Sequence, residues 1–195
     1  MIAEVVRRSP LADYADRFAA LSAATDGALS IRELPFVSQL NLRADPKDAD
    51  LMQRLATAIG FALPIVPNTV TSGEDRRALW LAPDEWLVVG PDGQQGVIEQ
   101  GISNGLNGSF GSIVDVSANR TLLEIRGAKA RNLLAHGVPI DLDDRSFGQG
   151  RCAQTLLAKT HVVIERRPAV ATLCLFVRSS FASHAACWVL EAASE

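Results

Sequence analysis

Short apolar segments separated by turn signals recur in the same order in both halves of this 195-residue chain. In the first half, an apolar stretch at residues 34–44 precedes a helical pattern, and two short apolar runs then flank Pro83-Asp84. Proline presets the φ angle that a turn needs, so these two runs predict neighbouring strands joined by a tight turn. A weaker helical pattern at residues 94–106 closes the first half.

The same order returns from Ser112 onward. The segment SIVDVSANRTLLEIRG predicts two strands around residues 117–119, and a short helix that ends at Gly137 follows it. A hairpin about Arg167-Pro168 and a last helix complete the second half. Strand, helix, two strands and helix is the order of split βαβ, ferredoxin-like units, and the tight turns predict an antiparallel sheet in an α+β fold.

These patterns predict the domain organisation. We expect an N-terminal arm and helix at residues 1–30, followed by a single α+β domain at residues 31–195. That domain is expected to consist of two halves, at about residues 31–111 and 112–195.

One helix of the first half has clear signals at both ends. Asp45 is the predicted N-cap, Pro46 occupies the first helical position, and Gly60 follows the end. Apolar residues at helical spacing, from Leu51 to Ile59, define its predicted buried face.

The N-terminal helix carries the predicted partner interface. Ser9-Pro10 predicts its start, and an apolar stripe at helical spacing follows two arginines. A terminal helix of this kind packs either on its own domain or on another subunit, and the sequence leaves both open. We assign the partner interface to Arg7, Arg8, Leu11, Tyr14 and Phe18.

Composition argues against several classes of protein. A formal net charge of −3 disfavours non-specific binding to nucleic acid, which needs concentrated positive charge. The longest apolar run, at residues 169–177, is about half as long as a membrane-spanning helix. The three cysteines form no C-x-x-C pair and are typical of reduced thiols. Since the N-terminus also lacks a signal-peptide pattern, we expect a cytoplasmic protein without a membrane segment.

Two motifs come close to a ligand site and fail. GPDGQQG places Gly90, Gly93 and Gly96 between a strand and a helix, but the dinucleotide fingerprint needs G-x-G-x-x-G and the Walker pattern needs Gly-Lys-Ser/Thr. DLDDRS begins like a calcium loop, but Ser146 replaces the required glycine and Cys152 the required glutamate. Both segments are therefore predicted to be ordinary loops.

The C-terminal segment SSFASHAACWVLEAA brings a hydroxyl, an imidazole and a thiol close together in sequence, at Ser180, His184 and Cys187. Nucleophilic catalysis needs a third group that orients the base, and a structural zinc site needs four ligands. No neighbouring residue supplies them. Helical spacing instead predicts a packed face organised by Phe181 and Trp188, with no catalytic, cofactor or metal role.

Three segments carry a resemblance to a known family. LWLAPDEWLVVGP, VDVSANRTLLEIRGAKARNLLAHGVPIDL and LFVRSSFASHAACWVLEAA together resemble the gamma subunit of heterotetrameric sarcosine oxidase. The resemblance covers residues 39–193. Its motifs are the Pro-Asp-Glu-Trp turn at residues 83–86, a strand–glycine–helix segment at residues 120–137, and the Arg178–Phe181–Trp188 pattern.

The resemblance implies a fold, a complex and its cofactors. The gamma subunit is similar to the folate-binding part of glycine-cleavage aminomethyltransferases, which is an α+β module. The complex of alpha, beta, gamma and delta subunits oxidises the N-methyl group of sarcosine, forms glycine and hydrogen peroxide, and passes the one-carbon unit to tetrahydrofolate. FAD, FMN and NAD belong to alpha and beta, zinc to delta, and folate to alpha, so the resemblance implies no cofactor or catalytic residue on gamma.

Our leading hypothesis is a non-catalytic gamma subunit that assembles and positions alpha, beta and delta partners. Without them it is expected to expose apolar surface or to self-associate. The alternative is a stand-alone folate-binding or aminomethyltransferase-like protein, for which Asp115 and Glu124 are candidate pterin partners by residue type alone. A third hypothesis, a complex that oxidises another N-methyl amine, is not distinguished by a gamma chain.

Overall fold

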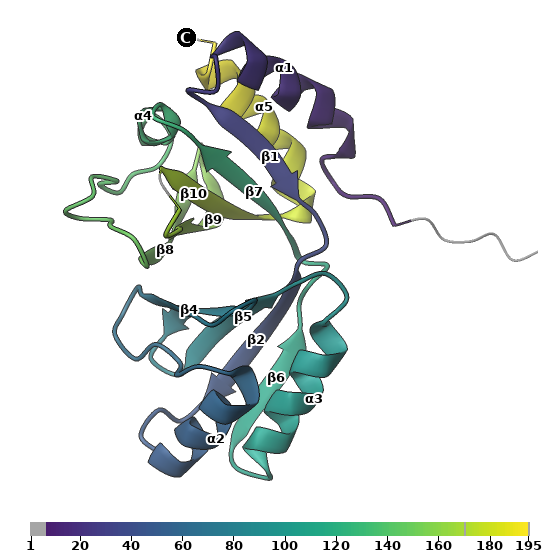
Figure 1. Cartoon of the computed structure of the whole chain (residues 1–195), viewed down its shortest axis with the longest axis vertical. Coiled ribbons are helices and arrows are strands. Elements are labelled where there is room, and N and C mark those ends of the chain that lie inside the picture. Colours follow the sequence, from purple (N-terminus) through teal and green to yellow (C-terminus); the bar gives the residue numbers. More distant parts are fainter. Residues whose placement is uncertain (1–6, 170, 195) are drawn as a thin grey trace, which may run out of the picture.

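Two five-stranded antiparallel sheets face each other in the computed structural model of the chain, and helices cover the outer side of each sheet (Figure 1). The structure describes residues 7–169 and 171–194. Residues 1–6 of the predicted arm lie outside the described residues. Within those described ranges, no helix is long and apolar enough to cross a membrane.

The lower sheet of Figure 1 has the strand order β3-β4-β5-β2-β6. Its strands are β2 (Ser38–Ala44), β3 (Val70–Ser72), β4 (Arg77–Ala82), β5 (Glu85–Gly90) and β6 (Gly111–Asp115). Helices α2 (Ala49–Ile59) and α3 (Gln95–Leu106) cover its outer face. Leu55, Trp86 and Ile102 are fully buried in the core between these helices and the sheet.

The upper sheet has the strand order β1-β7-β10-β9-β8. Its strands are β1 (Ser30–Leu34), β7 (Arg120–Arg126), β8 (Cys152–Leu157), β9 (Thr160–Arg166) and β10 (Thr172–Arg178). Its outer face packs against α1 (Ala15–Ala24), α4 (Ala130–Ala135) and α5 (Ala182–Ala192). The 3₁₀ turns η1 (Ala12–Tyr14) and η2 (Ser179–Phe181) lead into α1 and α5.

The mixed α+β, antiparallel prediction is confirmed, and the two sheets share one arrangement. The order β3-β4-β5-β2 in the lower sheet matches β8-β9-β10-β7 in the upper sheet. The fifth strand is β6 in the lower sheet, but in the upper sheet it is β1, which comes from the N-terminal side of the chain. The sheets therefore do not divide the chain at residue 111, since β6 stays in the lower sheet and β1 joins the upper one.

Three local features differ from their sequence predictions. Helix α2 begins after Asp48, whose carboxylate Oδ1 accepts a hydrogen bond from the Leu51 N–H at 2.9 Å, whereas Asp45 accepts from the Lys47 N–H in a preceding turn. Residues 154–167, expected as one strand of the hairpin about Arg167-Pro168, belong to two strands, β8 and β9, because residues 158 and 159 turn the chain with positive φ angles. Strands β6 and β7, predicted around residues 117–119, lie in different sheets.

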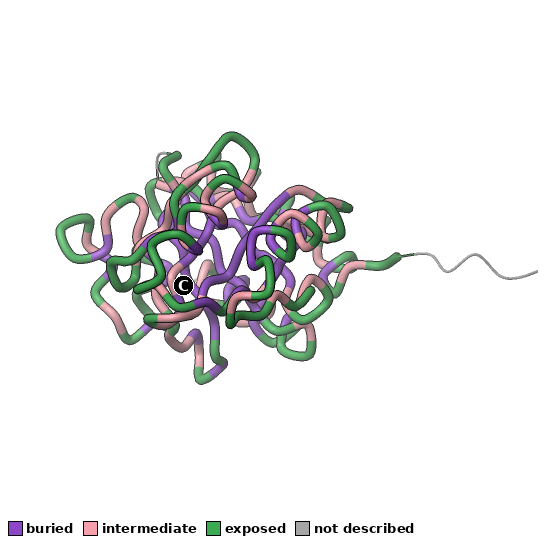
Figure 2. Tube along the Cα trace, turned by 90° about the horizontal axis from the view of Figure 1, so that it is seen from below, coloured by how far each residue is buried: buried purple, intermediate pink, exposed green. Residues whose placement is uncertain are grey.

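The inner faces of the two sheets pack against each other. Leu79, Leu87 and Val89 of the lower sheet form one apolar cluster with upper-sheet residues such as Leu122 and Phe176. Figure 2 shows that buried stretches of the chain lie in the middle of the molecule, with exposed stretches around them. Each sheet is therefore covered by helices on one face and by the other sheet on its second face.

A buried ion pair crosses this layer. The Arg77 Nε on β4 lies 2.9 Å from the Glu165 carboxylate on β9, and only 2% of the Glu165 side chain is exposed. The Arg77 guanidinium also lies over the Phe176 ring, 5.8 Å from its centroid. A charge buried to this extent needs a partner, so the pair fixes which part of β4 faces β9.

Removing one member of this pair is expected to destabilise the protein strongly. Glu165→Leu leaves the Arg77 charge buried without its partner, and we expect a loss of about 3–5 kcal/mol in the free energy of unfolding. Arg77→Met combined with Glu165→Leu should recover much of that loss. Arg167→Gln, which removes only the more exposed contact at 3.4 Å, serves as the control in urea unfolding. Equal losses for the single and double variants would contradict this account.

Candidate functional site

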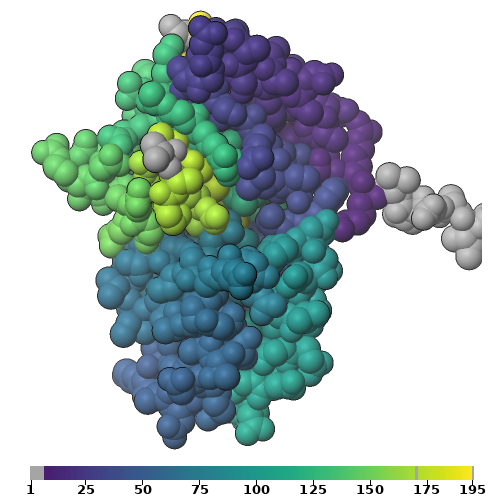
Figure 3. All heavy atoms as spheres, in the orientation of Figure 1, coloured from purple at the N-terminus to yellow at the C-terminus, as the bar shows by residue number. Residues whose placement is uncertain are grey.

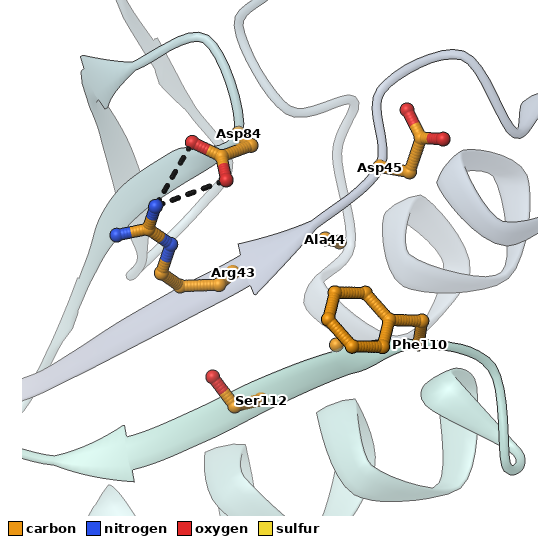
Figure 4. Close-up of a pocket in the computed structure, with 7 residues that line it drawn as sticks. Arg43, Ala44, Asp45, Asp84, Phe110 and Ser112 are labelled. Atoms are coloured by element: carbon orange, nitrogen blue, oxygen red, sulfur yellow. Dashed lines mark hydrogen bonds and ion pairs between the residues drawn. The ribbon is translucent and has the colours of Figure 1, made fainter.

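A pocket of about 680 Å³ lies where β2 ends and β6 begins (Figure 4). The Arg43 guanidinium donates to both oxygens of Asp84 at 3.0 and 3.2 Å and to Glu85 at 3.1 Å. The Asp84 hydrogen bond, chiefly, raises the pKa of Arg43. On the other side of the pocket, the Phe110 side chain is 96% exposed. An ion-paired arginine across a pocket from an exposed aromatic ring suits contact with another protein better than catalysis.

The residues predicted as the partner interface divide into two groups. Leu11 and Phe18 are 1% and 3% exposed and belong to the chain's own core on the outer side of the upper sheet. Arg7 and Arg8 remain exposed; Arg7 pairs with Asp92 at 3.0 Å, and Arg8 pairs with an acidic side chain of η1. The apolar stripe therefore packs largely within the chain. Of the residues predicted as the partner interface, Arg7, Arg8 and the half-buried Tyr14 keep accessible surface.

The C-terminal polar trio does not form a catalytic arrangement. The His184 Nε2 lies 3.2 Å from the Ala158 carbonyl oxygen, while the Cys187 Sγ lies 3.3 Å from the Tyr14 hydroxyl. That hydrogen bond is the main reason why the pKa of Tyr14 is raised. In the part of the chain that the structure describes, no hydrogen bond joins His184 to Ser180 or to Cys187.

The buried face of α5 differs from the predicted one. Phe181 is 48% exposed, and the fully packed positions are Ala182, Ala185, Ala186, Val189 and Leu190. Trp188 packs at the rim of this core, where a Cβ added to Gly137 would lie 2.5 Å from its ring. The small residues allow α5 to approach the sheet closely, so the aromatic rings are displaced toward its sides.

The remaining candidates are engaged in structural contacts. Glu124 is 4% exposed and forms ion pairs with Arg32 and Arg126, so no free carboxylate remains there for a pterin ring. Asp115 accepts hydrogen bonds from the backbone and side chain of Ser117. Among residues 7–169 and 171–194, no three His, Cys, Asp or Glu side chains are grouped to hold a metal ion.

Strand register creates one cluster that the sequence did not reveal. Arg120 on β7 lies directly opposite Arg178 on β10. Together with His161 and Gln154 they line a cavity of about 310 Å³. These residues come from four strands and match no local motif, so only the strand pairing brings them together.

The fold is shared with a solved aminomethyltransferase. The aminomethyltransferase T of the glycine cleavage system from Bartonella henselae aligns with a TM-score of 0.62 over 84% of this chain and 45% of that chain. At 14% sequence identity this likeness shows a shared fold alone. The chain thus has the two-sheet α+β fold found in an aminomethyltransferase.

Closer comparisons define the family. The family model described as sarcosine oxidase, gamma subunit family, matches residues 43–195. Sarcosine oxidase gamma subunits from Corynebacterium sp. (strain P-1) and an Arthrobacter species are each 35% identical over 97% of this chain and 91% of theirs. A chain of heterotetrameric sarcosine oxidase from Corynebacterium sp. U-96 superposes with a TM-score of 0.88 at 33% identity, covering 96% of this chain and 95% of that one. The chain belongs to the sarcosine oxidase gamma subunit family.

The two buried thiols are expected to be inert in the folded protein. Cys152 and Cys174 are at most 1% exposed, and desolvation, chiefly, raises the pKa of each to about 12. At pH 8 both should therefore resist iodoacetamide in native protein and react after unfolding in guanidinium, as mass spectrometry of the labelled peptides measures. Since unfolded thiols ionise near their ordinary pKa of 9.0, stability should fall as the pH rises from about 9 toward 12. Labelling of either thiol in the native state at a rate similar to the unfolded chain would refute the burial argument.

Truncating Phe18 is expected to destabilise the fold. Phe18→Ala removes a ring that is 3% exposed, and losses of about 3–5 kcal/mol are typical for such changes. Arg17→Ala, at the neighbouring exposed position, is the control and should stay within about 0.5 kcal/mol of the parent. Thermal unfolding measures both. If Phe18→Ala left the melting temperature unchanged while weakening assembly, the helix would belong to the partner interface instead of the core.

Proposed function

We propose that this chain is the gamma subunit of a heterotetrameric sarcosine oxidase complex and acts in assembling and positioning the catalytic subunits. The observation that carries this proposal is the full-length similarity to one chain of such an enzyme, with a TM-score of 0.88. The chain itself contributes no catalytic residue in this proposal. This agrees with the contacts of three candidate side chains: polar contacts to other parts of the chain for His184 and Cys187, and an ion pair for Glu124.

The proposed complex works in the cytoplasm and contains alpha, beta and delta subunits beside this chain. It oxidises the N-methyl group of sarcosine to give glycine and hydrogen peroxide, and it transfers the one-carbon unit to tetrahydrofolate. FAD, FMN, NAD, zinc and tetrahydrofolate are assigned to the partner subunits. The gamma chain supports these sites by holding its partners in place.

The open edge of the lower sheet is the proposed partner surface. Strand β6 pairs only with β2 within the sheet, so its second edge is free for contact in the described chain. Two large apolar side chains at this edge are well exposed: Phe110 at 96% and Val114 at 52%. Helix α3, which packs against β6, adds Val97 at 66%. Exposed apolar side chains gathered on an unpaired edge favour a protein interface.

Co-expression with the alpha, beta and delta chains tests the proposal. Gel filtration should show this chain eluting with the other three, and sarcosine-dependent peroxide production should require the assembled complex. A gamma chain that stays monomeric while the other chains assemble and turn over sarcosine normally would overturn the proposed function.

Substitution at the sheet edge tests the proposed surface separately. Phe110→Ser is expected to weaken assembly by about tenfold or more, as loss of a central aromatic contact does, without lowering the melting temperature of the isolated chain. Ile65→Ser, at another exposed apolar position, is the matched control. Unchanged assembly of the Phe110 variant would remove this edge from the interface and leave the subunit assignment in place.

A further inference from the structure

Strand pairing places three basic side chains in one row at the end of the upper sheet. Arg120 is the register partner of Arg178, and the β10–β9 register continued by one residue places His161 beside Arg178. Side chains alternate between the faces of a strand, so this row shares the face of Leu122 and Phe176, two residues further along their strands. That face is the one directed at the lower sheet.

The two arginines lack a counter-charge. Neither Arg120 nor Arg178 has an ion pair or a side-chain hydrogen bond among the described residues, although most other arginines of the chain are paired. The carboxylate that acts on Arg120 through space belongs to Glu85. Glu85 is already bonded to Arg43 at 3.1 Å and to the Asn41 amide at 2.7 Å. The two arginines therefore have no carboxylate in direct contact among the described residues.

This arrangement costs free energy without a ligand. Burial is the main cause that lowers the pKa of Arg120, and the charge of Arg178 is the second. The surroundings of Arg120 therefore disfavour the guanidinium cation. Like charges directly opposite on antiparallel strands are destabilising. An anion placed between the two side chains would reverse both effects, because guanidinium groups bind the paired oxygens of carboxylate and phosphate groups in a bidentate manner.

The cavity around the row has a fixed polar wall. The Gln154 amide nitrogen donates to the Leu81 carbonyl oxygen at 2.8 Å, which ties β8 to the lower sheet at the cavity. Thr155 and His161 complete the polar lining, and the volume is about 310 Å³. This volume lies at the lower limit of small-molecule sites, so it suits a small acid or a single acidic group better than a large cofactor.

We propose that Arg120, Arg178 and His161 form an oxyanion-binding site, for a carboxylate or phosphate group, at the end of the upper sheet. The oxyanion either belongs to a small free acid or projects from another protein chain. The first source is independent of the proposed function. The second rests on it, because the group would then be an acidic side chain of a partner subunit.

The first arm of the test uses the isolated full chain with malonate and inorganic phosphate as probes. At constant ionic strength, replacing chloride by either probe should raise the melting temperature by several degrees, and calorimetry should detect binding. Arg178→Gln should weaken binding by about tenfold or more and should fold normally, since its side chain is exposed. Arg145→Gln, an equal change of charge at a position whose side chain is 91% exposed and does not line the cavity, should bind as the parent does.

The second arm measures assembly with the partner chains. If neither probe binds, Arg178→Gln should still weaken assembly by about tenfold relative to Arg145→Gln, and Arg178→Lys should restore part of it, which identifies a partner carboxylate as the ligand. Absence of probe binding together with normal assembly of the Arg178→Gln variant overturns the site. Because the parent chain still assembles in that outcome, failure of the site is distinguishable from failure of the proposed function.

Discussion

The Arg77–Glu165 ion pair is the contact that the arrangement of the two sheets depends on. Each sheet is covered by helices on only one face, so its other face has no cover except the opposite sheet. Because the hydrophobic effect is non-directional, apolar side chains alone specify the alignment of two such sheets less sharply than a charged pair does. A carboxylate that is 2% exposed resists sliding of the sheets, since sliding would separate Glu165 from the Arg77 guanidinium and leave it only the longer contact with Arg167 at 3.4 Å.

Local structure was largely predictable, and the way in which strands combine was not. The turn at Pro83-Asp84 joins β4 and β5 as expected, and Gly60 ends α2 with a positive φ angle. The sequence also predicts a tight turn at residues 117–119, yet β6 and β7 on either side of it belong to different sheets. A turn signal reports only that the chain changes direction. Whether the next strand pairs with the previous one depends on contacts far away in sequence. In this fold β7 pairs with β1 and β10 and not with β6.

The same limit applies to the candidate sites. Leu11 and Phe18 are both buried, but only Phe18 lies in α1; Leu11 precedes the 3₁₀ turn η1, so the predicted helix begins later than its sequence signals indicate. Periodicity also does not say which surface such residues meet. The basic row was missed because Arg120 and Arg178 lie 58 residues apart and belong to no motif. Their shared position follows from the β7–β10 register, which single-sequence patterns do not contain. Register, more than residue type, therefore decides which side chains act together in this fold.

The origin of the fifth strand makes the two sheets unequal in a way that bears on assembly. In the upper sheet that strand is β1, and α1, which precedes it, packs against it and adds Phe18 to the core (Figures 1 and 3). In the lower sheet it is β6; both fifth strands have one neighbouring strand in the described chain, but the exposed large apolar side chains of Phe110 and Val114 lie at β6. Exposed edges favour pairing with other chains unless they are protected. The N-terminal segment thus occupies the chain's own upper sheet, and the edge at Phe110 and Val114 is left for a partner.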